Sequence, residues 1–337
     1  MDIRDLKDSK MVWFAISTAM IAGMIYFADV EKFIESVQSA RVLPLIPAFV
    51  LGLSIFPLLS YVWYRVFTAS GIHTTYWKAL KVFMAGNFMN SVTPLGQFGG
   101  EPLMAYLVQK NWDESYEKSI SSVFSADIMN ATPHVTFVVG GGLYMMLFHS
   151  INQLIVQALY ATLMMTVLGG LLVYLLWFEA GTIEGKIVDA LRKISSFVGK
   201  GSSVVDKLEE KLAEVEESFR AIGESPRYLF KTAVVAHIGF LTQVFCFYFI
   251  ALSLGFQADI TPIFFVTTLA GLATFSPTPG GSGTMEAAMA GLITVFFPGT
   301  SFATGLTVAI LFRITTYWPG ILLGWLALNN LQKGEIE

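Results

Sequence analysis

Charged residues are scarce in this sequence, and cysteine is nearly absent. Only 14% of the 337 residues are Asp, Glu, Lys or Arg, whereas a water-soluble domain carries roughly a quarter. A single cysteine, Cys246, excludes a disulfide framework and a thiolate metal site. The sequence also lacks a Walker-type phosphate loop, a carboxylate cluster and a histidine beside a carboxylate. We therefore expect no enzyme activity, no cofactor, no metal and no nucleic-acid partner.

Apolar residues are abundant and are concentrated in long blocks. They make up 54% of the chain, and the mean hydropathy is +0.62. Several blocks exceed the roughly 18 to 20 residues that cross a bilayer. The pattern predicts an all-α polytopic membrane protein with six transmembrane helices, near residues 11–28, 42–68, 116–149, 152–178, 228–255 and 301–328.

Two further apolar blocks are interrupted by proline and glycine. Block 78–109 contains TPLGQFGGE at 93–101, and block 260–297 contains SPTPGGSGTME at 276–286. Each arm beside these breaks has at most about 17 residues, or about 25 Å of helix. Both blocks are therefore expected to be re-entrant hairpins. Irregular backbone at membrane depth is tolerated only inside protein or beside a wet cavity, so the breaks mark the candidate site.

The distribution of basic residues predicts the orientation in the membrane. With the N-terminus inside, only Lys32 and Arg41 lie outside, and nearly all other Lys and Arg residues face the cytoplasm. The sequence thus predicts a multi-pass protein of the cell membrane with both termini cytoplasmic. Segment 180–227 combines charges with apolar residues at helical spacing, which indicates a solvated cytoplasmic amphipathic connector.

An internal repeat relates the two broken hairpins. A shift of 185 residues aligns 85–108 with 270–293 without a gap, with ten identities in 24 positions. Repeat 1 is expected at 42–149 and repeat 2 at 228–328, within a single membrane domain covering 1–337. Three crossings separate the equivalent helices, so the repeats are inverted. Inverted repeats with broken helices indicate a transporter site near the midplane, with alternating access.

The same segments carry a family resemblance. NSVTPLGQFGGEP at 90–102, FSPTPGGSGTMEAA at 275–288 and Arg313 in LFRITTYWPG resemble the lysylphosphatidylglycerol synthase transmembrane-region family of flippase-like membrane proteins. The resemblance covers nearly the whole chain. It implies translocation of anionic or aminoacylated phospholipids, or of polyprenyl-phosphate-linked precursors. Fused family members also contain lipid aminoacyl-transferases and glycosyltransferases.

The sequence departs from this family in one place. Members usually carry an acidic residue followed by arginine in the helix after the first hairpin, but here Asp127 is followed by Ile128. Ile128 is the repeat equivalent of Arg313. The departure argues against a mechanism that needs two symmetric arginines.

The residues of the two breaks suit a phosphate-bearing ligand. After each break a half-helix begins near mid-membrane, with free amides and the positive end of its dipole. Glycines there allow close backbone approach or unusual dihedral angles, although helix packing would also explain them. Asn87 and Asn90 precede the first break, where they either bind a headgroup or cap the hairpin. The remaining candidate substrate-binding residues of the breaks are Thr93, Gly96, Gly99, Gly100, Thr278, Gly280, Gly281, Ser282 and Gly283.

Charged side chains inside the apolar blocks complete the candidate site. Glu101 and Glu286 fall in the first turns of the half-helices, where they either stabilise the helix dipole, couple transport to protons, or contact a cationic headgroup. Arg313 lies about twelve residues into its helix, at a cost of roughly 2.5 to 3.5 kcal/mol. Arg313 either pairs with Asp127 across the internal axis, or binds a lipid phosphate directly after release from that pair.

These features predict a lipid transporter. Its substrate would be an anionic phospholipid or a polyprenyl-phosphate-linked lipid, moved between leaflets through a midplane site. The alternative is a non-transporting membrane scaffold that presents lipid to a separate membrane transferase.

Overall fold

The computed structural model describes residues 30–92, 100–148, 226–256, 259–276 and 278–332, with a few isolated positions elsewhere. Helices dominate these residues, and no strand occurs among them. The α-helices are α2 (Val30–Ser39), α3 (Val42–Ala69), α4 (Tyr76–Val92), α5 (Glu101–Trp112), α6 (Tyr116–Phe148), α10 (Pro226–Ser253), α11 (Ile260–Gly271), α12 (Thr284–Phe296), α13 (Phe302–Thr316) and α14 (Trp318–Gln332). Two 3₁₀ turns, Leu272–Phe275 and Pro279–Gly281, lie between α11 and α12.

Three stretches of the described chain are long and apolar enough to cross a membrane. They are Val42–Ala69, Pro226–Ser253 and Phe302–Leu331, and they match the expected spans at 42–68, 228–255 and 301–328. Helix α6 covers the expected span at 116–149. The expected spans at 11–28 and 152–178, and the connector at 180–227, lie outside the described residues apart from isolated positions and the start of α10.

The last span differs from the expected continuous helix. Helix α13 ends at Thr316, the backbone turns at Tyr317, and α14 begins at Trp318. Pro319 explains the interruption, because it has no amide hydrogen to donate to the carbonyl of Thr315 one turn earlier. The chain therefore bends four residues after Arg313.

Helix α2 was not expected from the sequence. Its ten residues are too few for a span, and its apolar residues occupy one face only. This helix packs against α13, where the hydroxyls of Ser36 and Thr304 lie 3.3 Å apart.

The described residues form two compact units. The first contains 1–60, 80–103 and 237–337, and the second contains 61–79 and 104–236. Both expected repeats contribute residues to each unit. The two hairpin breaks, α13 and α14 belong to the first unit, which therefore holds most of the candidate site.

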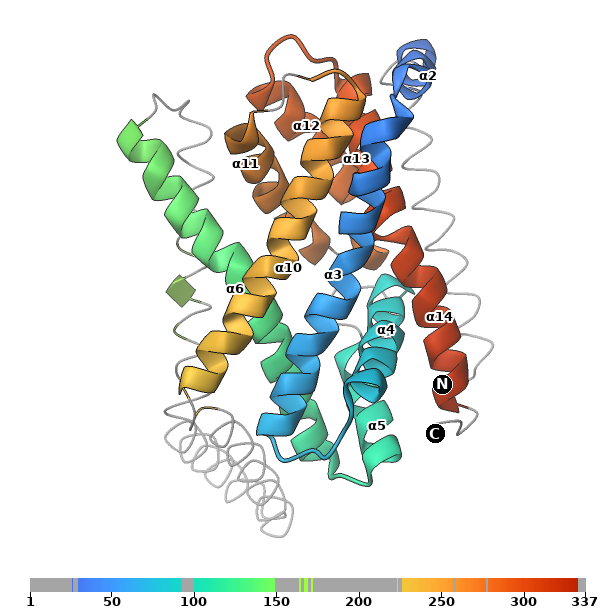
Figure 1. Cartoon of the computed structure of the whole chain (residues 1–337), viewed down its shortest axis with the longest axis vertical. Helices are drawn as coiled ribbons and strands as arrows, with labels where there is room; N and C mark the ends of the chain where they lie inside the picture. The colour runs from blue at the N-terminus through green and yellow to red at the C-terminus, as the bar shows by residue number, and fades with distance from the viewer. Residues whose placement is uncertain are drawn as a thin grey trace, which may run out of the picture. The chain divides into compact units, whose positions relative to one another are not determined.

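Small residues allow close helix packing in the first unit. A Cβ atom on Gly305 of α13 would lie 2.9 Å from the carbonyl oxygen of Ala290 in α12. A Cβ atom on Gly52 of α3 would lie 2.6 Å from the carbonyl oxygen of Thr315. Figure 1 shows α11, α12 and α13 beside one another. Close backbone approach through small residues is the usual way in which membrane helices associate.

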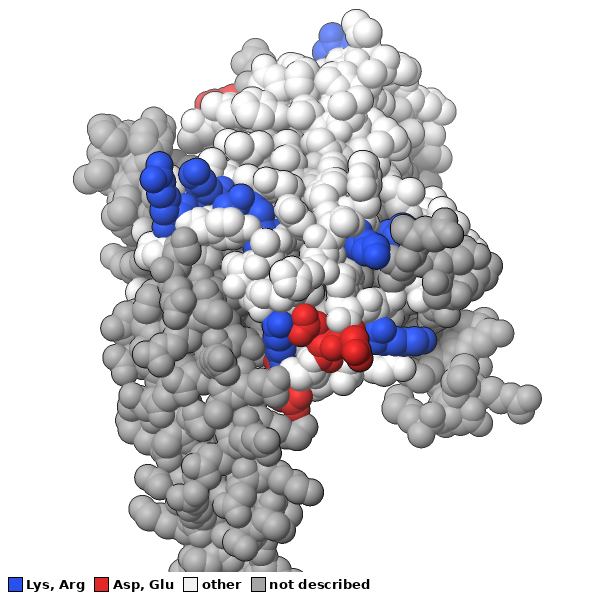
Figure 2. Space-filling view, turned by 60° about the horizontal axis from the view of Figure 1, so that its bottom comes forward, with Lys and Arg blue, Asp and Glu red and all other residues white. Residues whose placement is uncertain are grey.

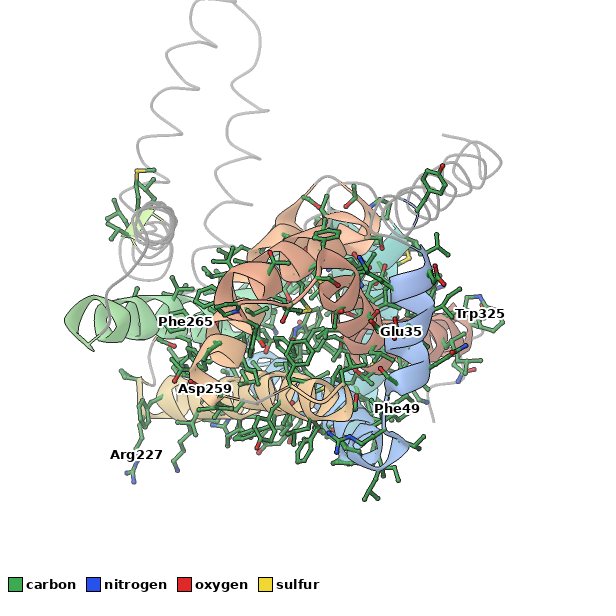
Figure 3. All side chains as sticks on the ribbon, turned by 90° about the horizontal axis from the view of Figure 1, so that it is seen from above. Glu35, Phe49, Arg227, Asp259, Phe265 and Trp325 are labelled. Atoms are coloured by element: carbon green, nitrogen blue, oxygen red, sulfur yellow. The ribbon has the colours of Figure 1, made fainter. Side chains whose placement is uncertain are left out.

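The described surface suits contact with lipid. Most of the described residues on the face in Figure 2 are uncharged, and the charged side chains among them gather in a few groups. Large apolar side chains are exposed: Trp325 of α14 is 51% exposed and points outward, and Phe49 of α3 is also exposed (Figure 3). Phe265 of α11, by contrast, is buried. An outward apolar surface is expected where the solvent is hydrocarbon.

The second unit has a polar anchor between α3 and α10. The Arg65 Nε atom donates to the Thr232 hydroxyl at 2.7 Å, and its guanidinium carbon lies 3.7 Å from the Tyr228 ring centroid. Tyr228 in turn donates its hydroxyl to the Arg65 carbonyl at 3.1 Å. An arginine stacked on a tyrosine at a helix end is typical of a membrane–water interface.

Candidate functional site

The second hairpin consists of two short helical arms and an irregular connection. Helix α11 has 12 residues and α12 has 13, which give lengths of about 18 and 20 Å. Neither arm reaches across a hydrocarbon core of about 30 Å. The two arms pack against each other. The first eight residues of the expected break 276–286 therefore lie between two helices that are individually too short to span, and its last three, from Thr284 to Glu286, form the start of α12.

Glycines produce the sharp turns of this break. Gly280, Gly281 and Gly283 have φ angles of 54°, 67° and 85°, a region that side-chain-bearing residues rarely adopt. Pro279 opens a short 3₁₀ turn that includes Gly280 and Gly281. These three glycines therefore adopt the unusual backbone dihedral angles that glycine allows.

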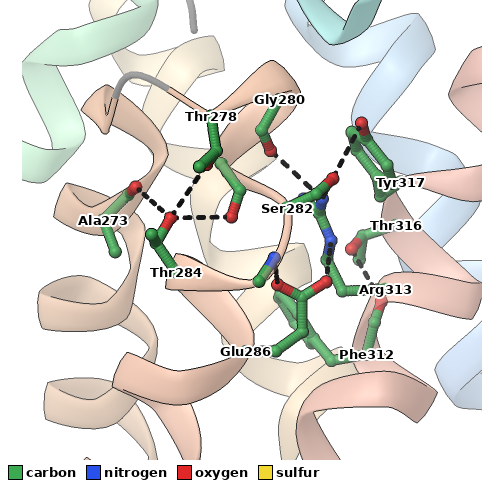
Figure 4. Close-up of polar contacts among 12 residues, drawn as sticks. Ala273, Thr278, Gly280, Ser282, Thr284, Glu286, Phe312, Arg313, Thr316 and Tyr317 are labelled. Atoms are coloured by element: carbon green, nitrogen blue, oxygen red, sulfur yellow. Dashed lines mark hydrogen bonds and ion pairs between the residues drawn. The ribbon is translucent and has the colours of Figure 1, made fainter. Parts of the chain in front are cut away.

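Three hydroxyl groups hold the two ends of the break together. The Ser276 Oγ atom lies 2.6 Å from Thr284 Oγ1 and 2.9 Å from Thr278 Oγ1. Thr284 also donates to the carbonyl oxygens of Gly281 and Ala273, at 3.0 and 3.3 Å. Thr284 is the first residue of α12, so this cluster fixes the start of that half-helix (Figure 4).

Glu286 caps α12 and is almost fully buried. Its Oε2 atom accepts a 2.7 Å hydrogen bond from the Gly283 amide. The carboxylate thus lies in the first turn of the half-helix, where the helix dipole favours negative charge. The expected dipole role of Glu286 is consistent with this geometry.

Arg313 is bound directly to the same hairpin. Its Nε atom donates to Glu286 Oε1 at 3.1 Å, and both side chains are about 95% buried. The Nη2 atom donates to the Gly280 carbonyl at 3.1 Å and to the Ser282 hydroxyl at 3.0 Å. Figure 4 shows the guanidinium enclosed by these groups. Within the described residues no hydrogen bond of Nη1 is found.

Tyr317 covers the guanidinium and connects it to the first hairpin. The Arg313 guanidinium carbon lies 3.3 Å from the Tyr317 ring centroid, a cation–π contact. The Tyr317 hydroxyl accepts from Ser282 and donates to the carbonyl of Ser91, both at 3.4 Å. Ser91 lies in the last turn of α4. One tyrosine therefore contacts both hairpins within the first unit.

The first hairpin is described on both sides of its break. The Asn90 Oδ1 atom accepts a 2.8 Å hydrogen bond from the Gly100 amide, so Asn90 caps the start of α5. Glu101 follows and is 2% exposed. Asn87 packs against α14, where a Cβ atom on Gly320 would lie 2.6 Å from its Nδ2 atom. Thr93, Gly96 and Gly99 lie outside the described residues.

The carboxylate that contacts Arg313 is Glu286, a pairing that the sequence did not suggest. Asp127 lies in α6 and belongs to the second unit. Its pairing with Arg313 stays a prediction. Arg313 and Glu286 both belong to repeat 2. The ion pair between them therefore lies within one repeat and does not link the two repeats.

Comparison with known proteins identifies the family. The family model described as the lysylphosphatidylglycerol synthase TM region matches residues 12–324. The chain belongs to this family. The match includes both hairpin breaks, Arg313, the first two apolar spans and most of the third, and it makes the protein an integral multi-pass membrane protein.

Curated relatives of this family member are archaeal membrane proteins. A UPF0104 membrane protein of Pyrococcus horikoshii is 25% identical over 336 residues, which cover 95% of this chain and 97% of the relative. A UPF0104 membrane protein of Methanocaldococcus jannaschii is 22% identical over 331 residues, with 96% and 94% coverage. A third, from Methanothermobacter thermautotrophicus, is 20% identical over 319 residues and is covered to 93%, as is this chain. The similarity therefore extends over essentially the full length of each protein.

Sequence reasoning missed three contributors to the site. Tyr317 follows Arg313 by four residues, so helical spacing alone would have placed both on one face. Ser276 and Thr284 lie near the two ends of the break, and neither was given a role of its own from the sequence. Their role depends on the fold of the break, because hydroxyls eight residues apart meet only when the chain turns back.

Proposed function

We propose that this protein moves an anionic lipid between the leaflets of the cell membrane through a site formed by its two broken hairpins. The observation that carries this proposal is the buried Arg313 guanidinium, held against irregular backbone between two helices too short to span a membrane. A cation at this position is costly in lipid unless it serves a ligand or a partner. Its Nη1 atom makes no hydrogen bond among the described residues, and a guanidinium with donors to spare suits a phosphate oxygen.

The substrate is an anionic phospholipid or a polyprenyl-phosphate-linked lipid, which share the phosphate. The amides at the start of α12 add donors, and the glycine-rich turn before them permits close approach of a headgroup. A phosphate would bind by replacing part of the contact between Arg313 and Glu286. The two repeats would then exchange conformations, so that the site opens to each leaflet in turn.

Leaflet exchange in proteoliposomes tests this function. Fluorescent phosphatidylglycerol, phosphatidylcholine and a polyprenyl phosphate are compared, with a membrane-impermeant reductant reporting the fraction in the outer leaflet. We expect accelerated exchange of at least one anionic lipid, and slower exchange of the zwitterionic one. Arg41→Ala removes an exposed arginine of the same unit and serves as the matched control for Arg313→Ala. Exchange at the rate of protein-free vesicles for every lipid would contradict transport.

A lipid-presenting scaffold is the second candidate function. The family is described as the TM region of a synthase, which favours a module that serves a lipid-modifying transferase. A scaffold binds lipid without moving it. Lipid binding that depends on Arg313, together with no leaflet exchange in the assay above, would select this function.

The inverted topology is a separate prediction. We propose six spans with both termini cytoplasmic, so that the break at 93–101 opens from the cytoplasm and the break at 276–286 from outside. Single cysteines at Gln97 and Ser282 are expected to react with impermeant maleimide from opposite sides in oriented vesicles. The native Cys246 is buried and is replaced by serine in this background. Labelling of both positions from one side only would show that the hairpins are not inverted.

A further inference from the structure

The two equivalent hairpin glutamates have different surroundings. In repeat 2, Glu286 Oε1 accepts from Arg313 and Oε2 accepts from the Gly283 amide. In repeat 1, Glu101 is 98% buried, and its Oε2 atom has no hydrogen-bond partner within the described part of the chain. The Glu101 carboxylate does interact with the Asn90 side chain and with its own backbone amide, but among the described residues it has no cation, whereas Glu286 is paired with one.

The sequence explains this asymmetry. Glu286 pairs with Arg313, and the repeat equivalent of Arg313 is Ile128. Residues 82–100, which precede Glu101, contain no charged side chain at all. The segment from 82 to 100 therefore offers Glu101 no cation.

Other charged groups near the first hairpin are distant along their helices or engaged elsewhere. On α4, Lys81 precedes Asn90 by nine residues, about 14 Å along the helix, and on α5 Lys110 follows Glu101 by the same number. Helix α14, which packs on α4 at Gly324, carries no ionisable side chain. No ion pair of Glu101 is found within the described residues. The remaining ionisable groups of the described first unit are Tyr26, Glu31, Lys32, Glu35 and Arg41 before or near α2 and α3, His237, Cys246 and Tyr248 on α10, Asp259 at the start of α11, and Glu286, Arg313 and Tyr317 of the second hairpin site.

A buried carboxylate without a cation is not stable as an anion. Transfer of an unpaired ion into low-dielectric surroundings is so costly that the group takes up a proton instead. A proton also fits the space, because it requires no coordination shell. From this geometry we propose that Glu101 is an exchangeable proton-binding site and that Glu286, held by Arg313, is not. Transport coupling, if the proposed function holds, then uses one carboxylate and not two.

Selective chemical labelling tests the site independently of transport. A hydrophobic carbodiimide reacts with a protonated carboxyl group, which gives its proton to a carbodiimide nitrogen while a carboxyl oxygen bonds to the central carbon. The full chain is treated in detergent micelles without added lipid substrate, and the adducts are located by peptide mass spectrometry. We expect the adduct at Glu101 to form at least tenfold faster than that at Glu286, and its rate to fall as pH rises. Glu101→Gln should remove the adduct.

Two variants of Arg313 test whether its charge protects Glu286 from the reagent. Arg313→Leu removes the cation beside Glu286, and Glu286 should then label at a rate approaching that of Glu101. Arg313→Lys retains the charge and serves as the folded control, in which Glu286 should stay protected. Equal labelling of both glutamates in the native protein, or no labelling of Glu101, would overturn the proposal. Suppression by sodium chloride at constant pH would also overturn it, since a metal cation would then occupy the site.

The outcomes of this test and of the transport test are distinguishable. A protein that labels selectively at Glu101 but moves no lipid retains the proton site and loses the proposed transport function. A protein that moves lipid but labels both glutamates equally retains transport and loses the asymmetric proton site.

Discussion

Arg313→Ala is expected to lower the free energy of unfolding by about 3 to 5 kcal/mol, as is typical when one partner of a buried ion pair is removed. The loss is large because Glu286 would remain buried with its Oε1 atom unpaired. The carbonyl of Gly280 and the hydroxyl of Ser282 would also lose their common donor. The midpoint of thermal unfolding in detergent measures the effect, and Arg41→Ala should lower it far less, because Arg41 is exposed and loses only its hydrogen bond to the Leu252 carbonyl.

A double variant separates stability from substrate binding. In Arg313→Leu with Glu286→Gln no buried charge is left unpaired, so this protein should unfold at a higher temperature than Arg313→Ala alone. If Arg313 binds the lipid phosphate, the double variant should fold but neither bind nor move anionic lipid. Normal lipid movement by this folded double variant would show that Arg313 has only a structural role.

Gly281→Ala is expected to destabilise the second hairpin strongly. The residue has a φ of 67°, and its added Cβ atom would lie 2.8 Å from the Thr274 Cα atom, which is backbone and cannot rotate away. The strained dihedral alone costs about 1 to 3 kcal/mol, and the overlap adds a cost of similar size. The start of α12 should shift, and lipid exchange should fall below detection.

Gly291→Ala provides the matched control in the same hairpin. Gly291 lies inside α12, and an added Cβ atom would meet nothing within 4 Å. Alanine is favoured over glycine in a helix by roughly 0.5 to 1 kcal/mol, so this variant should be equally stable or slightly more stable. Unfolding midpoints and lipid exchange are compared for the two variants. Similar losses in both would show that the turn at Gly281 is not required.

Local sequence signals predicted the helical arms and the break between α11 and α12. Proline and clustered glycine end helices whatever lies around them, so the limits of α11 and α12 follow closely from SPTPGGSGTME. The spans α3 and α10 were equally accessible, because each is a long apolar run with few charges. These features depend on residues close in sequence.

The contacts within the site depend on residues distant in sequence. Arg313 and Glu286 are 27 residues apart, and nothing in either local segment indicates that they pair. The repeat alignment instead placed Asp127 beside Arg313, because it compares equivalent positions and does not report contacts. The contact between the Tyr317 hydroxyl and the Ser91 carbonyl spans 226 residues, so local signals could place Tyr317 beside Arg313 but could not predict its link to the first hairpin.

The ion pair between Arg313 and Glu286 acts as a built-in competitor for any anionic ligand. Glu286 is tethered to the protein, so its effective concentration near the guanidinium far exceeds that of a lipid arriving from the bilayer. A phosphate gains only the difference between its own contacts and those it displaces. Binding is therefore weakened, while dissociation is accelerated by the returning carboxylate. For a protein that must release each lipid in order to take the next, turnover benefits from this modest affinity.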